Sequence, residues 1–378
     1  MFYPKPIILT LLASAASICL TSAAPPPPPP AVPAKLDPAE YISVPINRCD
    51  TPNRKCHKLN TAIVTEGSTN VTAAGFVTIP GYLFDLNSWK YYLLHLKIRM
   101  LSVDVNLGGV KCGRNAAFYT SQMKKEATLG TGYCDAHTDA TGTCNEMDIL
   151  EGNAATKAYS AHPYADTENG YCSHQGCNVN TNRDQNKFVG PGLYIDTTKT
   201  FTLVSAFTTH DKSDKGDLVG VQQWMLQDGK ALAQTLITDD YCLNIETWNL
   251  NYTKSGGLEE LGRSFDIGHV LVFSFWGDQN SIEYGNNMSW LDQGVANNAK
   301  CNQTAGESGP SYSNIRIEFI KDIKVLRLRR SNLPQTADSS HQTAPSLSFD
   351  DHIIDGLHHP RHSQEETALV FGGWGGGS

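Results

Sequence analysis

Residues 143–153 (TCNEMDILEGN) constrain the fold more than any other part of the chain. They place three carboxylates, Glu146, Asp148 and Glu151, among apolar residues that favour a strand. Side chains on a strand alternate between its two faces, so a regular strand would turn Glu151 away from Glu146 and Asp148. One extra residue near Ile149 and Leu150, a β-bulge, returns Glu151 to their face. The spacing therefore predicts a bulged strand in a packed sheet.

The apolar residues of the same stretch, Met147, Ile149 and Leu150, are expected to face the core and leave the acids on the opposite face. With the bulge, the backbones of Glu146 and Glu151 lie roughly 13 Å apart at about 3.3 Å per residue. Inward-leaning side chains would then bring the carboxyls toward the ~5–5.5 Å typical of retaining glycosidases. The alternative is a solvent-facing strand edge with three unrelated acids, since short acidic clusters are common.

The two ends of the chain differ in composition from its middle. Residues 1–24 carry a Lys, an apolar run and the small residues Thr21-Ser22-Ala23, which together predict a secretory signal. The apolar run is too short to span a membrane, so we expect a secreted protein without membrane association. Residues 25–45 begin with a run of prolines and are expected to form an extended linker. Residues 329–378 are polar and Gly-rich at the end, and are expected to be a disordered tail.

Residues 46–328 are long enough for one large β domain. Apolar runs and alternations rich in β-branched and aromatic residues predict strands at 101–105, 201–207, 270–276 and 315–320. Long amphipathic helical periodicity is absent, and turn signals punctuate the strands at Gly190-Pro191-Gly192, Asp228-Gly229 and Gly256-Gly257. The fold class is therefore predicted to be an all-β sandwich.

The charge balance bears on the partners. The formal net charge is −8, with 18% charged residues, and the central region has no basic cluster, which argues against nucleic-acid binding. A neutral polysaccharide needs no electrostatic attraction and is compatible with an acidic surface. His352, His358, His359 and His362 lie in the polar tail, where scattered histidines are usually solvated and not metal ligands.

Motifs on both sides of the acidic stretch resemble glycoside hydrolase family 7, which contains cellobiohydrolases and endoglucanases. The matches are collinear from about residue 45 to about residue 325, far more than one short motif would give. They are Val103-Asp104-Val105, Cys112-Gly113-Arg114-Asn115-Ala116-Ala117-Phe118-Tyr119, Gly130-Thr131-Gly132-Tyr133-Cys134-Asp135, Ala161-His162-Pro163, Gly190-Pro191-Gly192, Asp196-Thr197-Thr198-Lys199, Asp239-Asp240-Tyr241-Cys242, Phe275-Trp276 and Trp290-Leu291-Asp292.

The resemblance implies a concanavalin-like jelly-roll sandwich whose concave sheet holds a sugar chain. It implies a retaining endo-β-1,4-glucanase with Glu146 as nucleophile and Glu151 as acid/base. Asp148 would hydrogen-bond the nucleophile and help to keep the proton on Glu151. This chemistry needs no metal and no organic cofactor, and we expect a monomer that acts on a β-glucan.

The resemblance also implies a set of substrate-binding positions, each of which could otherwise be an ordinary strand, turn or surface residue. The tryptophans offer flat apolar faces suited to stacking on a sugar ring, and Trp290, in a polar setting, is the clearer binding residue of the two. The positions are Asn115, Tyr119, Tyr133, Asp135, His162, Arg183, Trp276 and Trp290.

Cysteine usage adds a further constraint. Of the ten cysteines, Cys19 leaves with the signal, and an odd number in a secreted chain leaves one without an internal partner. The resemblance implies that this one is Cys172, because Tyr164 stands where the family has its partner. It implies the pairs Cys49–Cys56, Cys112–Cys301, Cys134–Cys144 and Cys177–Cys242. Sequons at Asn70, Asn251, Asn287 and Asn302 predict N-glycans at some of these positions.

The chain also departs from the family. Few residues separate Cys134 from Cys144, where processive members carry substrate-covering loops, so we expect a short, open cleft and cleavage within chains. The alternatives are a cellobiohydrolase, a β-1,3(4)-glucanase of the family 16 type, which shares a Glu-x-Asp-x-x-Glu row, and a secreted carbohydrate-binding protein without turnover. The Cys134 and tryptophan matches argue against family 16, and the intact carboxylates argue against a protein that only binds.

Overall fold

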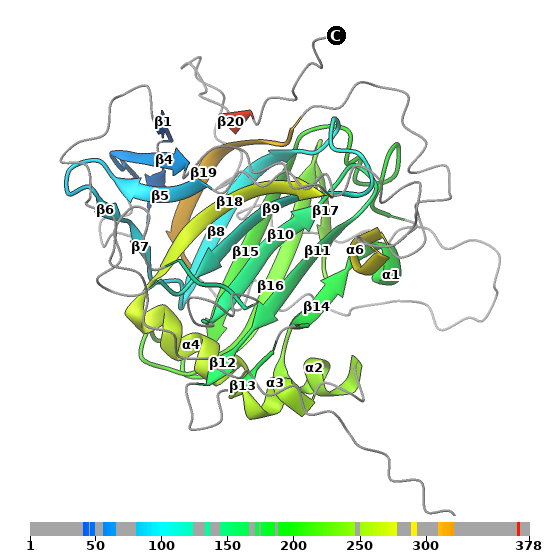
Figure 1. The fold of residues 1–378 in the computed structure, drawn as a ribbon. Coiled ribbons are helices and arrows are strands. Elements are labelled where there is room, and N and C mark those ends of the chain that lie inside the picture. Colours follow the sequence, from blue (N-terminus) through cyan, green and yellow to red (C-terminus); the bar gives the residue numbers. More distant parts are fainter. Residues whose placement is uncertain are drawn as a thin grey trace, which may run out of the picture.

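The fold is that of a computed structural model, which describes residues 41–44, 46–49, 56–65, 81–123, 133–136, 144–165, 171–173, 175–185, 188–245, 250–277, 289–292, 309–320 and 369–370. These residues form two large β-sheets that pack against each other, with a few helices at their margins (Figure 1). The predicted all-β sandwich is confirmed.

The first sheet carries the acidic stretch near its middle. Its path runs β1-β4-β5-β18-β9-β10-β11-β14, with β6 beside β5 and β7 beside β18. Its strands are β1 (Tyr41–Ser43), β4 (Thr61–Thr65), β5 (Gly81–Asp85), β6 (Lys90–Tyr91), β7 (Leu93–Leu94), β9 (Arg114–Ser121), β10 (Glu146–Gly152), β11 (Lys157–His162), β14 (Cys177–Asn180) and β18 (His269–Gly277). The acidic strand β10 is thus hydrogen-bonded on both sides, to β9 and to β11.

The second sheet covers one face of the first, and its path runs β17-β16-β15-β8-β19-β2-β3, with β20 beside β19. Its strands are β2 (Asn47–Arg48), β3 (His57–Lys58), β8 (Arg99–Asn106), β15 (Phe201–Thr209), β16 (Leu218–Gln227), β17 (Lys230–Ala233), β19 (Ser311–Phe319) and β20 (Leu369–Val370). The four predicted strands lie in β8, β15, β18 and β19, of which β19 begins earlier than expected, at Ser311.

The hairpin between β16 and β17 follows its sequence signal. Gln227 and Lys230 are paired, so the loop is the two residues Asp228 and Gly229. Both have positive φ, 49° and 74°, as a type I′ turn requires, and such a turn matches the twist of the strands it joins.

The helices are α1 (Thr181–Asp184), α2 (Asp239–Ile245), α3 (Leu250–Lys254), α4 (Gly257–Ile267) and α6 (Ser289–Asp292). Helix α4 corrects the expectation that amphipathic helical spacing is absent: Leu258, Leu261 and Phe265 recur at helical intervals and are buried. Gly256 and Gly257 are expected to mark a turn, but they begin this helix. Gly256 is its N-cap, with a φ of 84°, and Gly257 is its first residue.

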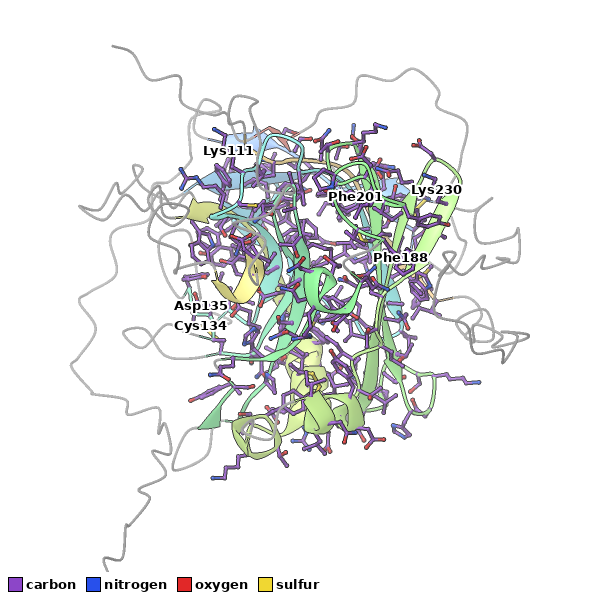
Figure 2. The ribbon with its side chains drawn as sticks, turned by 90° about the vertical axis from the view of Figure 1, so that its right-hand side faces the viewer. Lys111, Cys134, Asp135, Phe188, Phe201 and Lys230 are labelled. Atoms are coloured by element: carbon purple, nitrogen blue, oxygen red, sulfur yellow. A yellow bond between two sulfur atoms is a disulfide. The ribbon has the colours of Figure 1, made fainter. Side chains whose placement is uncertain are left out.

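The core lies between the two sheets. Met147, Ile149 and Leu150 belong to it and are fully buried, as the sequence predicts for the apolar side of the acidic stretch. Viewed edge-on, Cys134 and Asp135 lie on one side of the molecule, and Phe201 and Lys230 lie toward the other (Figure 2).

Three predicted disulfides are present, Cys49–Cys56, Cys134–Cys144 and Cys177–Cys242. Cys112 is also in a disulfide, whereas its predicted partner Cys301 lies outside the described residues. Cys172 lies in a two-stranded sheet of β12 (Tyr164–Ala165) and β13 (Tyr171–Cys172), directly opposite Tyr164. The register therefore places Tyr164 and Cys172 as neighbours, as expected if Tyr164 replaces a cysteine.

Two short strands lie outside residues 46–328, the predicted domain. Residues 41–43, assigned to the linker, form β1 and pair with β4. Residues 369–370, assigned to the tail, form β20 and pair with Ser311 and Tyr312 of β19. Short strands of this kind have no periodic signal, because their pairing partners are far away in the sequence. Residues 1–40, which contain the predicted signal, lie outside the described part. Within the described part, no helix has the length and apolar character needed to cross a membrane.

Candidate active site

The predicted bulge is present in β10. Asp148 and Glu151 pair with Ser160 and Ala158 of β11, so three steps along β10 match two along β11. On the other side, the register shifts by one residue between Asp148 and Leu150. The strand therefore holds one extra residue relative to both neighbours, and Glu151 returns to the face of Glu146 and Asp148.

The registers also define which other side chains share this face, because residues paired across strands point the same way. Glu146 pairs with His162 and with Ser121, and Asp148 pairs with Tyr119. Strand β18 continues the row, where Trp276 pairs with Asn115. Of the predicted site residues, those on this face are Asn115, Tyr119, Glu146, Asp148, Glu151, His162 and Trp276. We call it the cleft face, and the opposite face of the same sheet the core face.

Glu146 lies deep in the cleft face, with 6% of its surface exposed. Its Oε2 accepts a hydrogen bond of 2.8 Å from the backbone N–H of Ala136. Ala136 belongs to the segment that the Cys134–Cys144 disulfide ties to the start of β10. The Ala136 N–H therefore lies against Glu146 and stabilises its ionised form.

Glu151 is less buried and is held by Asn115. The Asn115 Nδ2 donates to Glu151 Oε1 at 2.8 Å, and its Oδ1 accepts from the N–H of Gly152 at 3.0 Å. Asn115 itself is fully buried. The resemblance implies a position near the nucleophile for this residue, whereas the structure places it against the proposed acid/base.

Asp148 is paired with His162, whose Nε2 lies 2.9 Å from Asp148 Oδ2. The other ring nitrogen, Nδ1, lies 2.8 Å from the backbone carbonyl of Ser173. A carbonyl only accepts, so Nδ1 carries a hydrogen, and the contact with Asp148 holds one proton, on the ring or on the carboxyl. The ring rests on Gly176, where a Cβ would lie 2.5 Å from its Cε1.

A chain of hydroxyls borders the row. Tyr133 donates to Asp135 Oδ2 at 2.7 Å, and the Tyr119 and Tyr133 oxygens are 2.8 Å apart. Because Tyr133 uses its one proton on Asp135, Tyr119 is the donor between the two tyrosines. Burial, followed by the charge of Glu146, raises the pKa of the Tyr119 hydroxyl well above its ordinary value.

The remaining predicted site residues are less completely placed. Arg183 in α1 contacts Asp184, Asn178 and Tyr241, which are contacts of a structural kind. Trp290 lies in α6, and its side chain is outside the described residues. The helix is fixed by Asp292, which accepts from Asn153 Nδ2 at 2.7 Å and from the Gly113 N–H at 2.9 Å. These contacts join α6 to the ends of β9 and β10.

The electrostatics of the row follow from crowding and burial. Burial and then the charge of Asp148 raise the pKa of Glu151 from 4.5 to about 8. Burial and then repulsion from Asp148 raise the pKa of Glu146 well above its ordinary value, against the opposing effects of His162 and the Ala136 N–H. Burial and then Asp135 raise the pKa of Asp148. The row thus retains protons at pH values where isolated carboxyls would have lost them.

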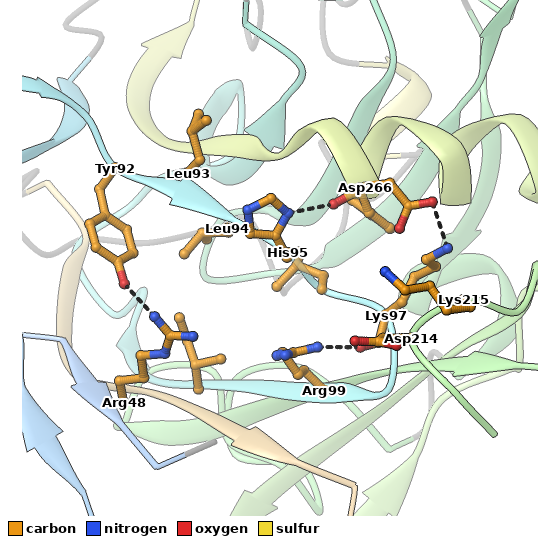
Figure 3. Close-up of a pocket in the computed structure, with 13 residues that line it drawn as sticks. Arg48, Tyr92, Leu93, Leu94, His95, Lys97, Arg99, Asp214, Lys215 and Asp266 are labelled. Carbon is orange, nitrogen blue, oxygen red and sulfur yellow. Dashed lines mark hydrogen bonds and ion pairs between the residues drawn. The ribbon is translucent and has the colours of Figure 1, made fainter. Parts of the chain in front are cut away.

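A cavity of about 550 Å³ lies elsewhere, beside α4 and the start of β8 (Figure 3). Two of its charged groups are engaged within the protein: Lys97 contacts Asp266 at 2.8 Å, and Arg99 donates to the Lys97 carbonyl. It contains none of the acidic row. The one cluster of metal-ligating residue types in the described residues is Cys49, Cys56 and Glu318, and its two cysteines are joined as a disulfide.

Sequence reasoning missed several groups of the site. The Ala136 N–H and the Ser173 carbonyl are backbone groups, and no residue type announces them. Gly176 was detectable as an isolated glycine beside Cys177, although nothing in the sequence links it to His162.

Residues 137–316 match the profile of Glycosyl hydrolase family 7. The structure of an endoglucanase I complexed with cellobiose superposes with a TM-score of 0.60 at 25% identity, covering 75% of this chain and 97% of that one. In sequence profile this part of the chain is similar to glycosyl hydrolase family 7.

The chain is also similar to named glucanases and to a further solved structure. The chain is 32% identical over 271 residues to a probable endo-beta-1,4-glucanase, celB, of Aspergillus terreus, which covers 60% of this chain and 62% of that protein. It is 32% identical over 268 residues to endoglucanase EG-1 of Hypocrea jecorina, covering 64% and 55%. The chain thus spans less than two thirds of either relative. A GH7 family cellobiohydrolase from Daphnia pulex shares the fold with a TM-score of 0.59 at 21% identity, covering 74% of this chain and 97% of that one.

Proposed function

We propose that the protein is a secreted, retaining endo-β-1,4-glucanase. The observation that carries the proposal is the one-residue bulge in β10, which puts Glu146, Asp148 and Glu151 on one face. Together with the pKa of Glu151 near 8, it supplies a proton donor and a second carboxylate along one strand.

In the proposed reaction, Glu146 attacks the anomeric carbon while Glu151 gives its proton to the departing glycosidic oxygen. The glycosyl ester on Glu146 is then hydrolysed by a water molecule, whose proton goes to Glu151. The first step needs Glu146 ionised while Glu151 is protonated. The Ala136 N–H and a charged His162 favour ionisation of Glu146, and Asp148 favours protonation of Glu151.

Sugar binding is supported by the composition of the cleft face. Trp276 is half-buried and shares this face with Asn115 and Tyr119. An indole ring suits the apolar face of a pyranose, and polar neighbours suit its hydroxyls. The endoglucanase names of the relatives and the cellobiose in the related structure support a β-1,4-glucan.

The second candidate is a cellobiohydrolase, because a protein with that name shares the fold. Carboxymethyl cellulose separates the two. An endo-acting enzyme lowers its viscosity before many reducing ends appear, whereas release of cellobiose from chain ends at nearly constant viscosity would exclude endo action. Lichenan, tested in parallel, identifies a family 16 type of preference, and inactivity on all these substrates would leave only a binding protein.

The stereochemistry tests the mechanism separately. Two displacements at one carbon restore its configuration, so proton NMR in the first minutes should show the β-anomer. An initial α-anomer would indicate a carboxyl separation of roughly 6.5–9.5 Å with direct attack by water.

A further inference from the structure

At the bulge, a backbone carbonyl accepts a hydrogen bond from a side chain of the other sheet. Ile149 is the residue without a partner in the register between β10 and β9, and it is fully buried between the two sheets. Its carbonyl accepts a hydrogen bond of 2.7 Å from Gln223 Nε2. Gln223 belongs to β16 of the second sheet, so the bulge of one sheet is held by a side chain of the other.

Gln223 is itself fixed in one orientation. Its Oε1 accepts from Lys157 Nζ, and its Nε2 also donates to Ser205 Oγ at 2.9 Å. A backbone carbonyl only accepts, so the amide nitrogen must face Ile149, which leaves the amide oxygen to face Lys157. Gln223, Lys157 and Ser205 are all fully buried, and no solvent competes for these bonds.

Lys157 is suited to this role by its surroundings. It is the first residue of β11 and pairs with Gly152, next to Glu151. Its Nζ lies 4.7 Å from the centre of the Tyr159 ring. The side chain therefore points to the core face directly behind the part of β10 that carries the acid/base.

We propose that Gln223, oriented by Lys157 and Ser205, is a positioning residue that holds the β10 bulge and thereby the carboxyl of Glu151. Without Gln223, the buried Ile149 carbonyl would lose this hydrogen bond, which disfavours the bulged register. A strand without the extra residue would turn Glu151 to the core face. The inference rests on the proposed function, because it assigns Gln223 to the step in which Glu151 transfers a proton.

The alternative is that this network only stabilises the sandwich. In that case the variants lose activity equally on all substrates, because a smaller fraction of the protein is folded. Loss of positioning predicts a selective loss, because a substrate with a good leaving group needs no proton from Glu151. The ratio of the two rates separates these explanations.

The test variant is Gln223→Met, which keeps the length of the side chain and removes its hydrogen bonds. We expect kcat on cello-oligosaccharides to fall by about tenfold or more. The pre-steady-state rate of dinitrophenolate release from a dinitrophenyl β-cellobioside should fall by less than about threefold, because this first step needs no proton from Glu151, whereas hydrolysis of the ester still needs Glu151 as base. The matched control is Gln227→Met on the same strand. Gln227 is buried and donates to the carbonyls of Asp196 and Thr200, away from the bulge, so its loss should leave the ratio unchanged.

Gln223→Glu is the second variant, and it covers the case in which Gln223→Met does not fold. An ionised Glu keeps the acceptor for Lys157 but has no hydrogen to give to Ile149, so it should show the same selective loss. A ratio equal to that of Gln227→Met in every folded variant would overturn the proposal.

Titration of the Glu151 carboxyl by carbon NMR provides a readout that does not depend on turnover. We expect its pKa to move away from about 8 in either Gln223 variant, since the carboxyl leaves its place beside Asn115 and Asp148. An unchanged pKa would contradict the inference even if the enzyme were inactive. Inactivity of the wild-type protein on all β-glucans would instead refute the proposed function.

Discussion

The two faces of strands β10 and β11 bury ionisable groups in different ways. On the cleft face, Glu146, Asp148 and His162 crowd together and share protons, and burial raises the pKa of both carboxyls. On the core face, Lys157 contacts the amide oxygen of Gln223 and the ring of Tyr159, and burial lowers its pKa from 10.5 to about 7.

The difference teaches which property each face supplies. On the cleft face, crowded carboxyls can change protonation near neutral pH, which acid/base chemistry needs. On the core face, the hydrogen bonds that join Lys157, Gln223 and the Ile149 carbonyl allow one arrangement, which fixes the backbone of the bulge. The bulge contributes to both faces: it turns Glu151 toward the cleft face, and its Ile149 carbonyl binds Gln223 in the core.

The largest expected effect breaks the cleft face at its two glutamates. Glu146→Gln should lower kcat by at least about a thousandfold on every substrate, because no carboxylate remains to form the ester. Glu151→Gln should show a similar loss on cello-oligosaccharides and spare the first step on a dinitrophenyl β-cellobioside, which needs no proton. Stopped-flow detection of dinitrophenolate measures that step. Equal loss in both variants on the activated substrate would contradict the division of roles.

The next effect sharpens the comparison through stability. Glu151 has a folded-state pKa near 8, so the unfolded chain ionises first, and stability is lost as pH rises from about 4.5 to about 8. Glu151→Gln removes this loss and should gain about 2–4 kcal/mol over wild type between pH 4 and pH 8. Urea midpoints at several pH values measure the difference.

Lys157 should show the opposite trend. Its folded-state pKa is about 7, so the unfolded chain gains a proton first, and stability is lost as pH falls from about 10.5 to about 7. Lys157→Met should therefore gain stability relative to wild type over that range and stay level below it. Lys58→Met, at an exposed position of β3, is the control and should show no such trend. Parallel curves for the Glu151 and Lys157 variants would remove the contrast between the faces.

The smallest effect concerns the support of His162. Gly176→Ala combines a φ of 62° with a Cβ that would lie 2.7 Å from His162 Nε2, whereas Gly192, with a φ of 70°, has nothing within 4 Å. Gly192→Ala should cost about 1 kcal/mol of backbone strain. Gly176→Ala should cost more than that and also lower kcat, because the ring must shift away from Asp148. Melting temperatures and rates of both variants provide the measurement, and equal behaviour would show that Gly176 does not support the ring.

The bulge could be predicted from the sequence because the spacing of the three acids does not fit a regular strand. Three carboxylates that act together must lie on one face, and their spacing allows this only with an extra residue near Ile149. Strand alternation likewise predicted β8, β15 and β18, and the family resemblance implied the three disulfides that are present. These features have local or family-specific signals.

The features that were missed depend on contacts between distant residues. Gln223 and Lys157 are polar residues that a sequence reader assigns to solvent, and only the packing of the two sheets shows that they are buried together. Helix α4 was overlooked because its Gly256-Gly257 start looks like a turn. Strands β1 and β20 are too short to carry a pattern.

The contact between Gln223 and Ile149 spans 74 positions of the chain, and this has a consequence for recombination between relatives. A chimera that exchanges β10 and β11 as one block would take the bulge from one parent and the residue at position 223, which binds its carbonyl, from the other. Crossovers that keep residues 146–162 and β16 from the same parent should retain activity more often than crossovers that separate them. Recombination during evolution should then keep residues 146–162 and β16 together, although they lie in different sheets.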